Sequence, residues 1–202
     1  MDTTKPLPNN MMLFMLTQLE STLGKNGLTT VLKYSGLDRL IDNYPPRDFN
    51  PGEPFDTFAT IIINLMELYG ENGYRAVVRG VGVQTFDEMR KDLPWFFEVE
   101  NGALDDLSPP ERFGVMYSSY IEKASQVFGT TADLTIKPNQ IIDITPDSVW
   151  CVGLTAQKPI CIFTLDFYTG MARWMGVEEI SVVETHCRAA GDDVCRFVST
   201  FR

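Results

Sequence analysis

The hydrophobic residues of the first 130 positions recur at helical spacing. Met11–Leu23 is apolar nearly all round, which predicts a buried helix. Phe55–Tyr69 carries apolar residues at every third or fourth position and predicts an amphipathic helix. Pro109–Pro110 stands where a missing N–H costs least, at the start of a helix predicted over Glu111–Phe128. Tyr74–Lys91 fits either a strand or a helix, and we favour a helix.

The pattern changes after Gly129, where short β-type runs alternate with turn residues. The predicted strands are 134–137, 140–144, 149–154, 179–186 and 194–201. Cys161–Met175 returns to helical spacing, and Gly191–Asp193 predicts a turn between the last two strands. Helices followed by an antiparallel sheet with packed helices form an α+β fold, which is the predicted class.

The N-terminal part is predicted to be an extension. Residues 1–54 would form a helical segment and 55–202 the main domain, because four prolines between Tyr44 and Pro54 indicate a loop. A helix that is apolar on all sides needs a partner to cover it. A second copy of the chain would serve, so a homodimer is expected.

Composition limits the classes of function. The 202 residues carry a formal net charge of −10, which argues against non-specific binding to nucleic acid phosphates. No stretch is long and apolar enough to predict a membrane span, and the N-terminus lacks the features of a signal peptide. Free cysteines without an export signal favour a reducing compartment, so a cytoplasmic protein is expected.

Candidate metal chemistry lies near the C-terminus, in the pattern Cys161–x22–Glu184–x2–Cys187–x7–Cys195. Thiolate and carboxylate groups that converge on one point suit a soft divalent cation, and zinc is the expected ion. Four protein donors leave no position for water, as in structural zinc sites. Spacing alone leaves a second interpretation open, in which the cysteines are small apolar fillers of the core.

The segment from Pro159 to Phe197 resembles the 4-vinyl reductase domain, which also forms the sensory domains of phenol-responsive bacterial activators. The matching features are Cys161 before Ile162–Gly170, Gly176, Glu184–Cys187, and Gly191–Phe197. The resemblance implies a metal set of Cys161, Glu184, Cys187 and Cys195. It also implies the fold of nitric-oxide-signalling and Golgi-transport ligand-binding domains, usually dimeric.

Aromatic side chains are frequent in the same region, and they either pack the core or line a pocket for an apolar guest. The resemblance implies a pocket beside the metal, lined by Leu165 and Val182, and we add Trp150 from a neighbouring segment. The phenol sensors grip a hydroxyl with a His and a Trp. This chain has no histidine before His186, so a larger and less polar guest is expected.

Other chemical motifs receive structural interpretations. Cys151 is predicted to be a core filler, His186 to border the metal site, and Asp192–Asp193 to form a turn. Gly80–Gly82 lacks the third glycine of a nucleotide loop and is predicted to serve helix packing or a turn. No catalytic residue is identified.

These observations predict a zinc-stabilised carrier or sensor of a hydrophobic molecule, such as a tetrapyrrole intermediate, an aromatic compound or a hydrocarbon. One alternative is an enzyme or enzyme subunit of (bacterio)chlorophyll synthesis that acts on a vinyl group, although the chain carries no flavin or nicotinamide fingerprint. Another alternative is a regulatory or scaffolding module that signals through a partner protein.

Overall fold

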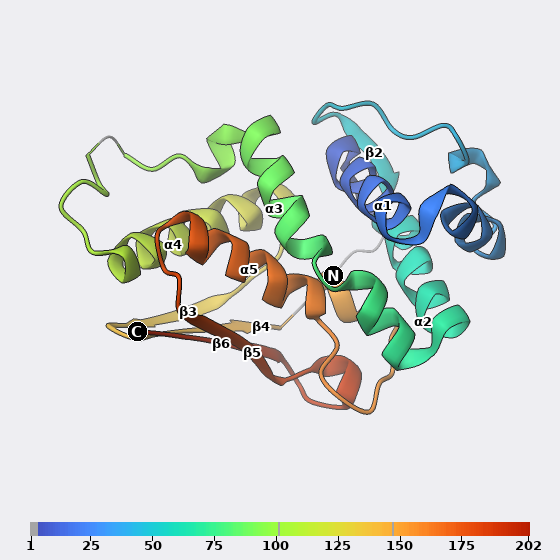
Figure 1. Cartoon of the computed structure of the whole chain (residues 1–202). Helices are drawn as coiled ribbons and strands as arrows, with labels where there is room; N and C mark the ends of the chain where they lie inside the picture. Colours follow the sequence, from blue (N-terminus) through green and yellow to red (C-terminus); the bar gives the residue numbers. More distant parts are fainter. Residues whose placement is uncertain (1–3, 101, 147) are drawn as a thin grey trace.

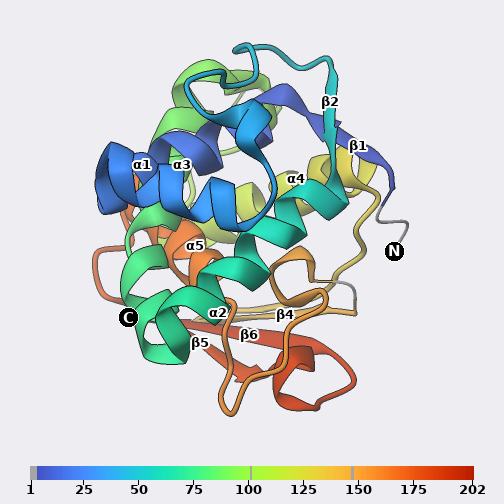
Figure 2. The ribbon, with the colours of Figure 1, turned by 90° about the vertical axis from the view of Figure 1, so that its right-hand side faces the viewer.

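The helices lie together on one face of an antiparallel sheet, as Figures 1 and 2 show from two directions. This computed structural model describes residues 4–100, 102–146 and 148–202. The α+β class predicted from the sequence is confirmed. None of the helices in the described ranges is long and apolar enough to cross a membrane.

The elements have the following bounds. The helices are α1 (Asn9–Tyr34), α2 (Phe55–Val78), α3 (Val81–Asp92), α4 (Pro109–Phe128) and α5 (Ile162–Trp174). The strands are β1 (Pro6–Pro8), β2 (Pro51–Pro54), β3 (Asp133–Lys137), β4 (Gln140–Thr145), β5 (Ile180–His186) and β6 (Cys195–Phe201). Short 3-10 turns are η1 (Asp38–Leu40), η2 (Pro94–Phe97), η3 (Val149–Cys151) and η4 (Arg188–Ala190).

The main sheet has the order β3-β4-β6-β5, with every neighbouring pair antiparallel. The last strand of the chain therefore lies inside the sheet, between β4 and β5. Its register sets Phe197 opposite both Asp143 and Glu184, and Cys195 opposite Thr145. Residues that lie opposite each other on neighbouring strands face the same side of the sheet. Asp143 of β4 and Glu184 of β5, both opposite Phe197, therefore face the side that the helices cover.

α1 and α2 each consist of two helical segments that meet at a glycine. The predicted helix ends at Leu23 and Tyr69 lie directly before Gly24 (φ 69°, ψ 166°) and Gly70 (φ 66°, ψ 174°), both of which are outside helical geometry. The single helix favoured over Tyr74–Lys91 is wrong, since α2 ends at Val78 and α3 begins after Gly80. Gly80 has φ 81°, a left-handed conformation that glycine adopts at low cost.

The strand predicted over 149–154 is also wrong. Val149–Cys151 is a 3-10 turn, and Gly153 with φ 73° prevents an extended continuation. The apolar run is explained by burial, since Cys151 and Leu154 belong to the core. A short apolar run indicates that a segment is buried but does not indicate its backbone conformation. The apolar pattern of 149–154 therefore could not distinguish a strand from a 3-10 turn.

The N-terminal segment packs into the same core as the rest of the chain. β1 pairs with β2, so the predicted loop before Phe55 contains a strand, and α1 packs on α2 and α3. Phe14 and Leu16 are buried within a single chain, so α1 needs no second copy to cover it. The homodimer and the boundary at residue 54 stay predictions. Residues 1–3 of the extension lie outside the described part.

Helices α3 and α5 meet closely because glycine stands at their contact. A Cβ added to Gly82 would overlap the carbonyl oxygen of Phe163 and lie 2.7 Å from the backbone nitrogen of Phe167. Gly80 N–H donates a hydrogen bond of 2.5 Å to Asp166 Oδ2 of α5. The prediction that Gly80–Gly82 serves helix packing is confirmed. This contact holds α5, which carries much of the site described below.

We expect Gly82→Ala to lower the free energy of unfolding by about 1–3 kcal/mol, because the new methyl group meets backbone that cannot move away. Urea denaturation measures the change. Gly114→Ala in α4 is the matched control, since its Cβ would meet only the Ile136 side chain, at 3.3 Å. Alanine there is expected to be neutral or stabilising. Equal effects of both changes would contradict the packing account.

Candidate metal centre and adjoining cavity

Four potential ligands from distant parts of the chain meet at one point. Cys161 precedes the first turn of α5, Glu184 lies on β5, Cys187 follows β5 and Cys195 begins β6. Their ligand atoms all lie within 4.8 Å of one another. The structure therefore brings together the whole metal set named from the sequence, in a buried position.

The turn between the last two strands explains how Cys187 and Cys195 approach. η4 is followed by Gly191 with φ 100°, which reverses the chain. Asp192 Oδ2 accepts a hydrogen bond of 2.7 Å from Cys187 N–H, and Cys187 C=O accepts one of 3.2 Å from Asp192 N–H. The prediction that Asp192 is a turn former is confirmed.

One pair of donors has the spacing that a tetrahedral zinc ion requires, and all four ligand atoms lie within 4.8 Å of one another. Zn–S bonds of about 2.3 Å require sulfur atoms roughly 3.8 Å apart, and the Cys161 and Cys195 sulfurs are 3.8 Å apart. Glu184 Oε2 accepts a hydrogen bond of 2.8 Å from Cys161 N–H, whereas its buried Oε1 has no hydrogen-bond partner within the described ranges. Burial raises the pKa of Glu184 to about 8. A cation would satisfy the orphaned oxygen.

Cys151 lies beside these four donors. It is buried in the core as predicted, and its sulfur lies 3.5 Å from the Cys195 sulfur. The Ser148 hydroxyl, directly before η3, lies 3.5 Å from the Cys161 sulfur. The end of η3 therefore contacts the sulfur atoms of the group of four, to which Cys151 itself does not belong.

His186 was predicted to border the metal site. It stands two residues after Glu184 on the edge strand β5, where its side chain is exposed. Its Nδ1 lies 3.1 Å from the Thr185 hydroxyl. The histidine is outside the group of four converging donors.

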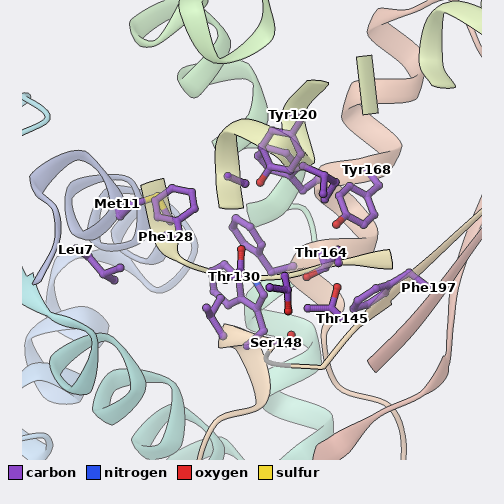
Figure 3. Close-up of a pocket in the computed structure, with 18 of the residues that line it drawn as sticks. Leu7, Met11, Tyr120, Phe128, Thr130, Thr145, Ser148, Thr164, Tyr168 and Phe197 are labelled. Carbon is purple, nitrogen blue, oxygen red and sulfur yellow. The ribbon is translucent and has the colours of Figure 1, made fainter. Parts of the chain in front are cut away.

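A cavity of about 110 Å³ adjoins the cluster. Figure 3 shows side chains from several helices converging on it, with Leu7, Met11 and Phe128 on one side and Tyr168 and Phe197 on the other. Phe163 stacks on Trp150 with ring centroids 3.8 Å apart. The walls are mostly aromatic and aliphatic, which suits an apolar guest.

Of the three residues proposed from the sequence to contact a guest, Trp150 lines the cavity, while Leu165 and Val182 do not. Helix α5 presents residues 163, 164, 167 and 168 to the cavity, and position 165 lies on another side of the same helix. Val182 lies on β5, which β6 separates from β4. Both side chains pack against the core instead.

Two segments of the chain, η3 and the start of α5, contribute side chains both to the cysteine cluster and to the wall of the cavity. Within η3, Cys151 reaches the sulfur cluster while Trp150 lines the cavity. At the start of α5, Cys161 belongs to the cluster, and Phe163 two residues later lines the cavity. An ion that fixes the cysteines would therefore also fix the aromatic walls.

A buried carboxylate lies behind one side of the cavity. Asp143 is 0% exposed, and its Oδ2 accepts hydrogen bonds from the hydroxyls of Tyr168 (2.8 Å) and Tyr117 (2.9 Å). Its Oδ1 accepts one of 2.9 Å from Thr145. Burial raises the pKa of Asp143, and the three hydroxyl donors oppose that rise. The sequence analysis missed this group, although alternation along β4 places Asp143 on the inner face with Ile141.

No family model and no curated protein matches the chain. Solved structures do resemble it. A structure described as "Probing the function of heme distortion in the H-NOX family" aligns with TM-score 0.64 and 15% identity, over 97% of this chain and 95% of that chain. An oxygen-binding H-NOX domain related to soluble guanylate cyclases aligns with TM-score 0.59 and 16% identity, over 97% and 95%. This likeness establishes the fold alone, and the fold agrees with the one expected from the sequence.

Heme is named for the first of these neighbours. Protein ligands to haem iron are His, Cys, Met or Tyr. The single histidine is exposed on β5 and the four cysteines lie at the sulfur cluster, whereas Met11, Met89, Tyr120 and Tyr168 line the cavity. The cavity of about 110 Å³ is smaller than the roughly 150 Å³ of an apolar cavity known to hold benzene. The described cavity is therefore too small for a haem.

We expect Cys161→Ser, Cys195→Ser and Glu184→Gln each to weaken zinc affinity by at least the roughly 10–100-fold known for loss of an outer-shell partner. Each change removes one of four converging donors. Competition titration with a zinc chelator measures the affinity, and elemental analysis gives the stoichiometry. Cys151→Ser is the matched control, a buried cysteine outside the group of four. Loss of zinc in Cys151→Ser but not in Glu184→Gln would show that Cys151 is the fourth ligand.

Proposed function

We propose that this protein binds a small apolar ring compound in the cavity beside α5, as a carrier or sensor, and that a zinc ion holds the cavity walls in place. The observation that carries the proposal is the shared wall, in which η3 and the start of α5 each contribute to both the sulfur cluster and the cavity.

Zinc would be held by Cys161, Glu184, Cys187 and Cys195. Support comes from the donor distances, from the orphaned Glu184 oxygen, and from the resemblance of the C-terminal segment to the 4-vinyl reductase domain. Four protein ligands close the coordination shell, so the ion would stabilise structure and would not activate a water molecule. Thiolates are preferred ligands of a soft metal ion, so metal binding explains the converging cysteines better than apolar packing does.

The size of the cavity selects among the guests suggested by the sequence. The cavity of about 110 Å³ is somewhat smaller than the roughly 150 Å³ cavity that holds benzene and far smaller than the roughly 300–1,000 Å³ of pockets for drug-sized ligands. A single ring would therefore need only a small outward movement of the walls. An aromatic or hydrocarbon compound of one ring is therefore favoured, and a tetrapyrrole would require the walls to move apart. Stacking of Phe163 on Trp150 supplies a flat surface for such a ring.

We expect toluene to bind the zinc-loaded protein and to raise its unfolding temperature, because ligand bound only to the folded state stabilises it. Ala124→Leu is expected to abolish the shift, because the added side chain fills a cavity that Ala124 lines. Val115→Leu, on the same helix but exposed, is the control and should behave as the unmodified protein. A toluene shift that survives Ala124→Leu would place the binding site elsewhere.

Removal of zinc with a chelator is expected to destabilise the fold and to weaken toluene binding, because the cluster and the cavity share walls. A loss of about 3 kcal/mol would lower the unfolding temperature by roughly 6–12 °C in a chain of this size. Calorimetry with and without added zinc measures both effects. Unchanged toluene affinity in a folded, zinc-free protein would contradict the proposal that the metal ion holds the cavity walls in place.

A further inference from the structure

We propose that the metal centre has two alternative fourth ligands, Glu184 for zinc and the Cys151 sulfur for a softer, thiophilic cation such as cadmium. Cys161, Cys187 and Cys195 would bind either ion, so a soft cation would be held by four thiolates. This inference rests on the proposed function, because it assumes the metal centre described there. It adds a second class of ion and the residue that selects it.

The Cys151 sulfur lies at ligand spacing from the cluster. Two thiolates on one tetrahedral zinc ion lie roughly 3.8 Å apart. The Cys195 sulfur is 3.8 Å from the Cys161 sulfur and 3.5 Å from the Cys151 sulfur. It is therefore close enough to share one ion with either of them. A thiolate at Cys151 would complete a set of four sulfurs with Cys161, Cys187 and Cys195.

Glu184 and Cys151 offer atoms of different softness to an ion. Soft cations select thiolates, harder ones suit carboxylates, and zinc accepts both. Glu184 is 8% exposed, and its Oε1 has no hydrogen-bond partner in the described part of the chain, so a zinc ion gains an oxygen ligand there. A softer ion gains more from the sulfur of Cys151 than from this oxygen.

Each of these two side chains has a partner when the other one binds the ion. The Cys151 thiol donates a hydrogen bond of 3.4 Å to the carbonyl oxygen of Ser148, so it is satisfied as a neutral group beside a zinc site. Glu184 Oε2 accepts its hydrogen bond from Cys161 N–H without a metal.

The exchange of ligands balances. The S–H bond of Cys151 and the metal–oxygen bond of Glu184 break, a metal–sulfur bond forms, and the proton passes to the carboxylate. The net charge of the buried group stays the same, so the exchange buries no additional charge.

Variants separate the two ligands, because Cys151 and Glu184 lie on different segments, η3 and β5. Competition titration with a chelator, with the thiols kept reduced, gives the dissociation constants of zinc and cadmium. The ratio of the zinc constant to the cadmium constant is expected to fall by about tenfold or more in Cys151→Ser and to rise by as much in Glu184→Gln. Cys195→Ser, which removes a shared ligand, is the control and should raise both constants.

The ratio is measured within one variant, so a general loss of stability affects both ions alike. Cys151→Ala serves if Cys151→Ser does not fold, because alanine places no hydroxyl in the apolar core. An unchanged ratio in the Cys151 variants would overturn the inference.

Cadmium-113 NMR identifies the ligands directly, since the resonance moves upfield when oxygen replaces sulfur or when a sulfur ligand is lost. The unmodified protein and Glu184→Gln are expected to share one chemical shift, and the resonance of Cys151→Ser is expected to lie upfield of it. A resonance that moves in Glu184→Gln, or one that stays in place in Cys151→Ser, would overturn the inference while leaving the zinc centre intact. Failure of the unmodified protein to bind either ion would overturn both the inference and the proposed zinc centre.

Discussion

The structure depends on the meeting of three buried sulfur atoms and one buried carboxylate at the junction of α5, β5 and β6. The sulfurs of Cys161 and Cys195 are 3.8 Å apart, and Glu184 Oε1 has no partner in the described part of the chain. An arrangement of this kind is costly to bury without a cation, because an unpaired carboxylate loses its hydration. The same residues begin the elements that surround the cavity, so whatever satisfies the cluster also shapes the binding space.

The fold and the chemistry of the site carry different information. The arrangement of helices over a sheet is shared with H-NOX domains along nearly the whole chain, at 15–18% identity. A fold supports many chemistries, and the site decides among them. Here the cavity contains Trp150 and Phe163 stacked on each other, and the only histidine is exposed on the edge strand β5. The cavity beside α5 is lined largely by aromatic side chains.

Asp143 shows how the protein accommodates a second buried carboxylate without a cation. Three hydroxyl groups donate to it, from Tyr117, Thr145 and Tyr168. The two buried carboxylates thus have different surroundings, sulfur atoms at Glu184 and hydroxyl groups at Asp143. The first suits a soft metal ion, and the second holds the hydroxyls of Tyr168 and Thr145, which line the cavity. Both lie opposite Phe197 of β6, on its two neighbouring strands, so one central strand organises the two environments.

The sequence by itself determined the α+β class and the terminal hairpin. It also named the four residues that converge, although spacing alone left open that the cysteines only fill the core. Local spacing brings Glu184, Cys187 and Cys195 together, because they lie within one hairpin and Gly191 marks its turn, whereas Cys161 lies outside the hairpin and was assigned through the resemblance of the C-terminal segment. Only the tertiary structure decided that the Cys151 sulfur lies beside the cluster, that Leu165 and Val182 do not line the cavity, and that Asp143 lies behind it. Those facts depend on helix rotation, on a 3-10 turn in place of a strand, and on strand order. Such features arise from contacts between distant segments, which hydrophobic periodicity along the chain does not encode.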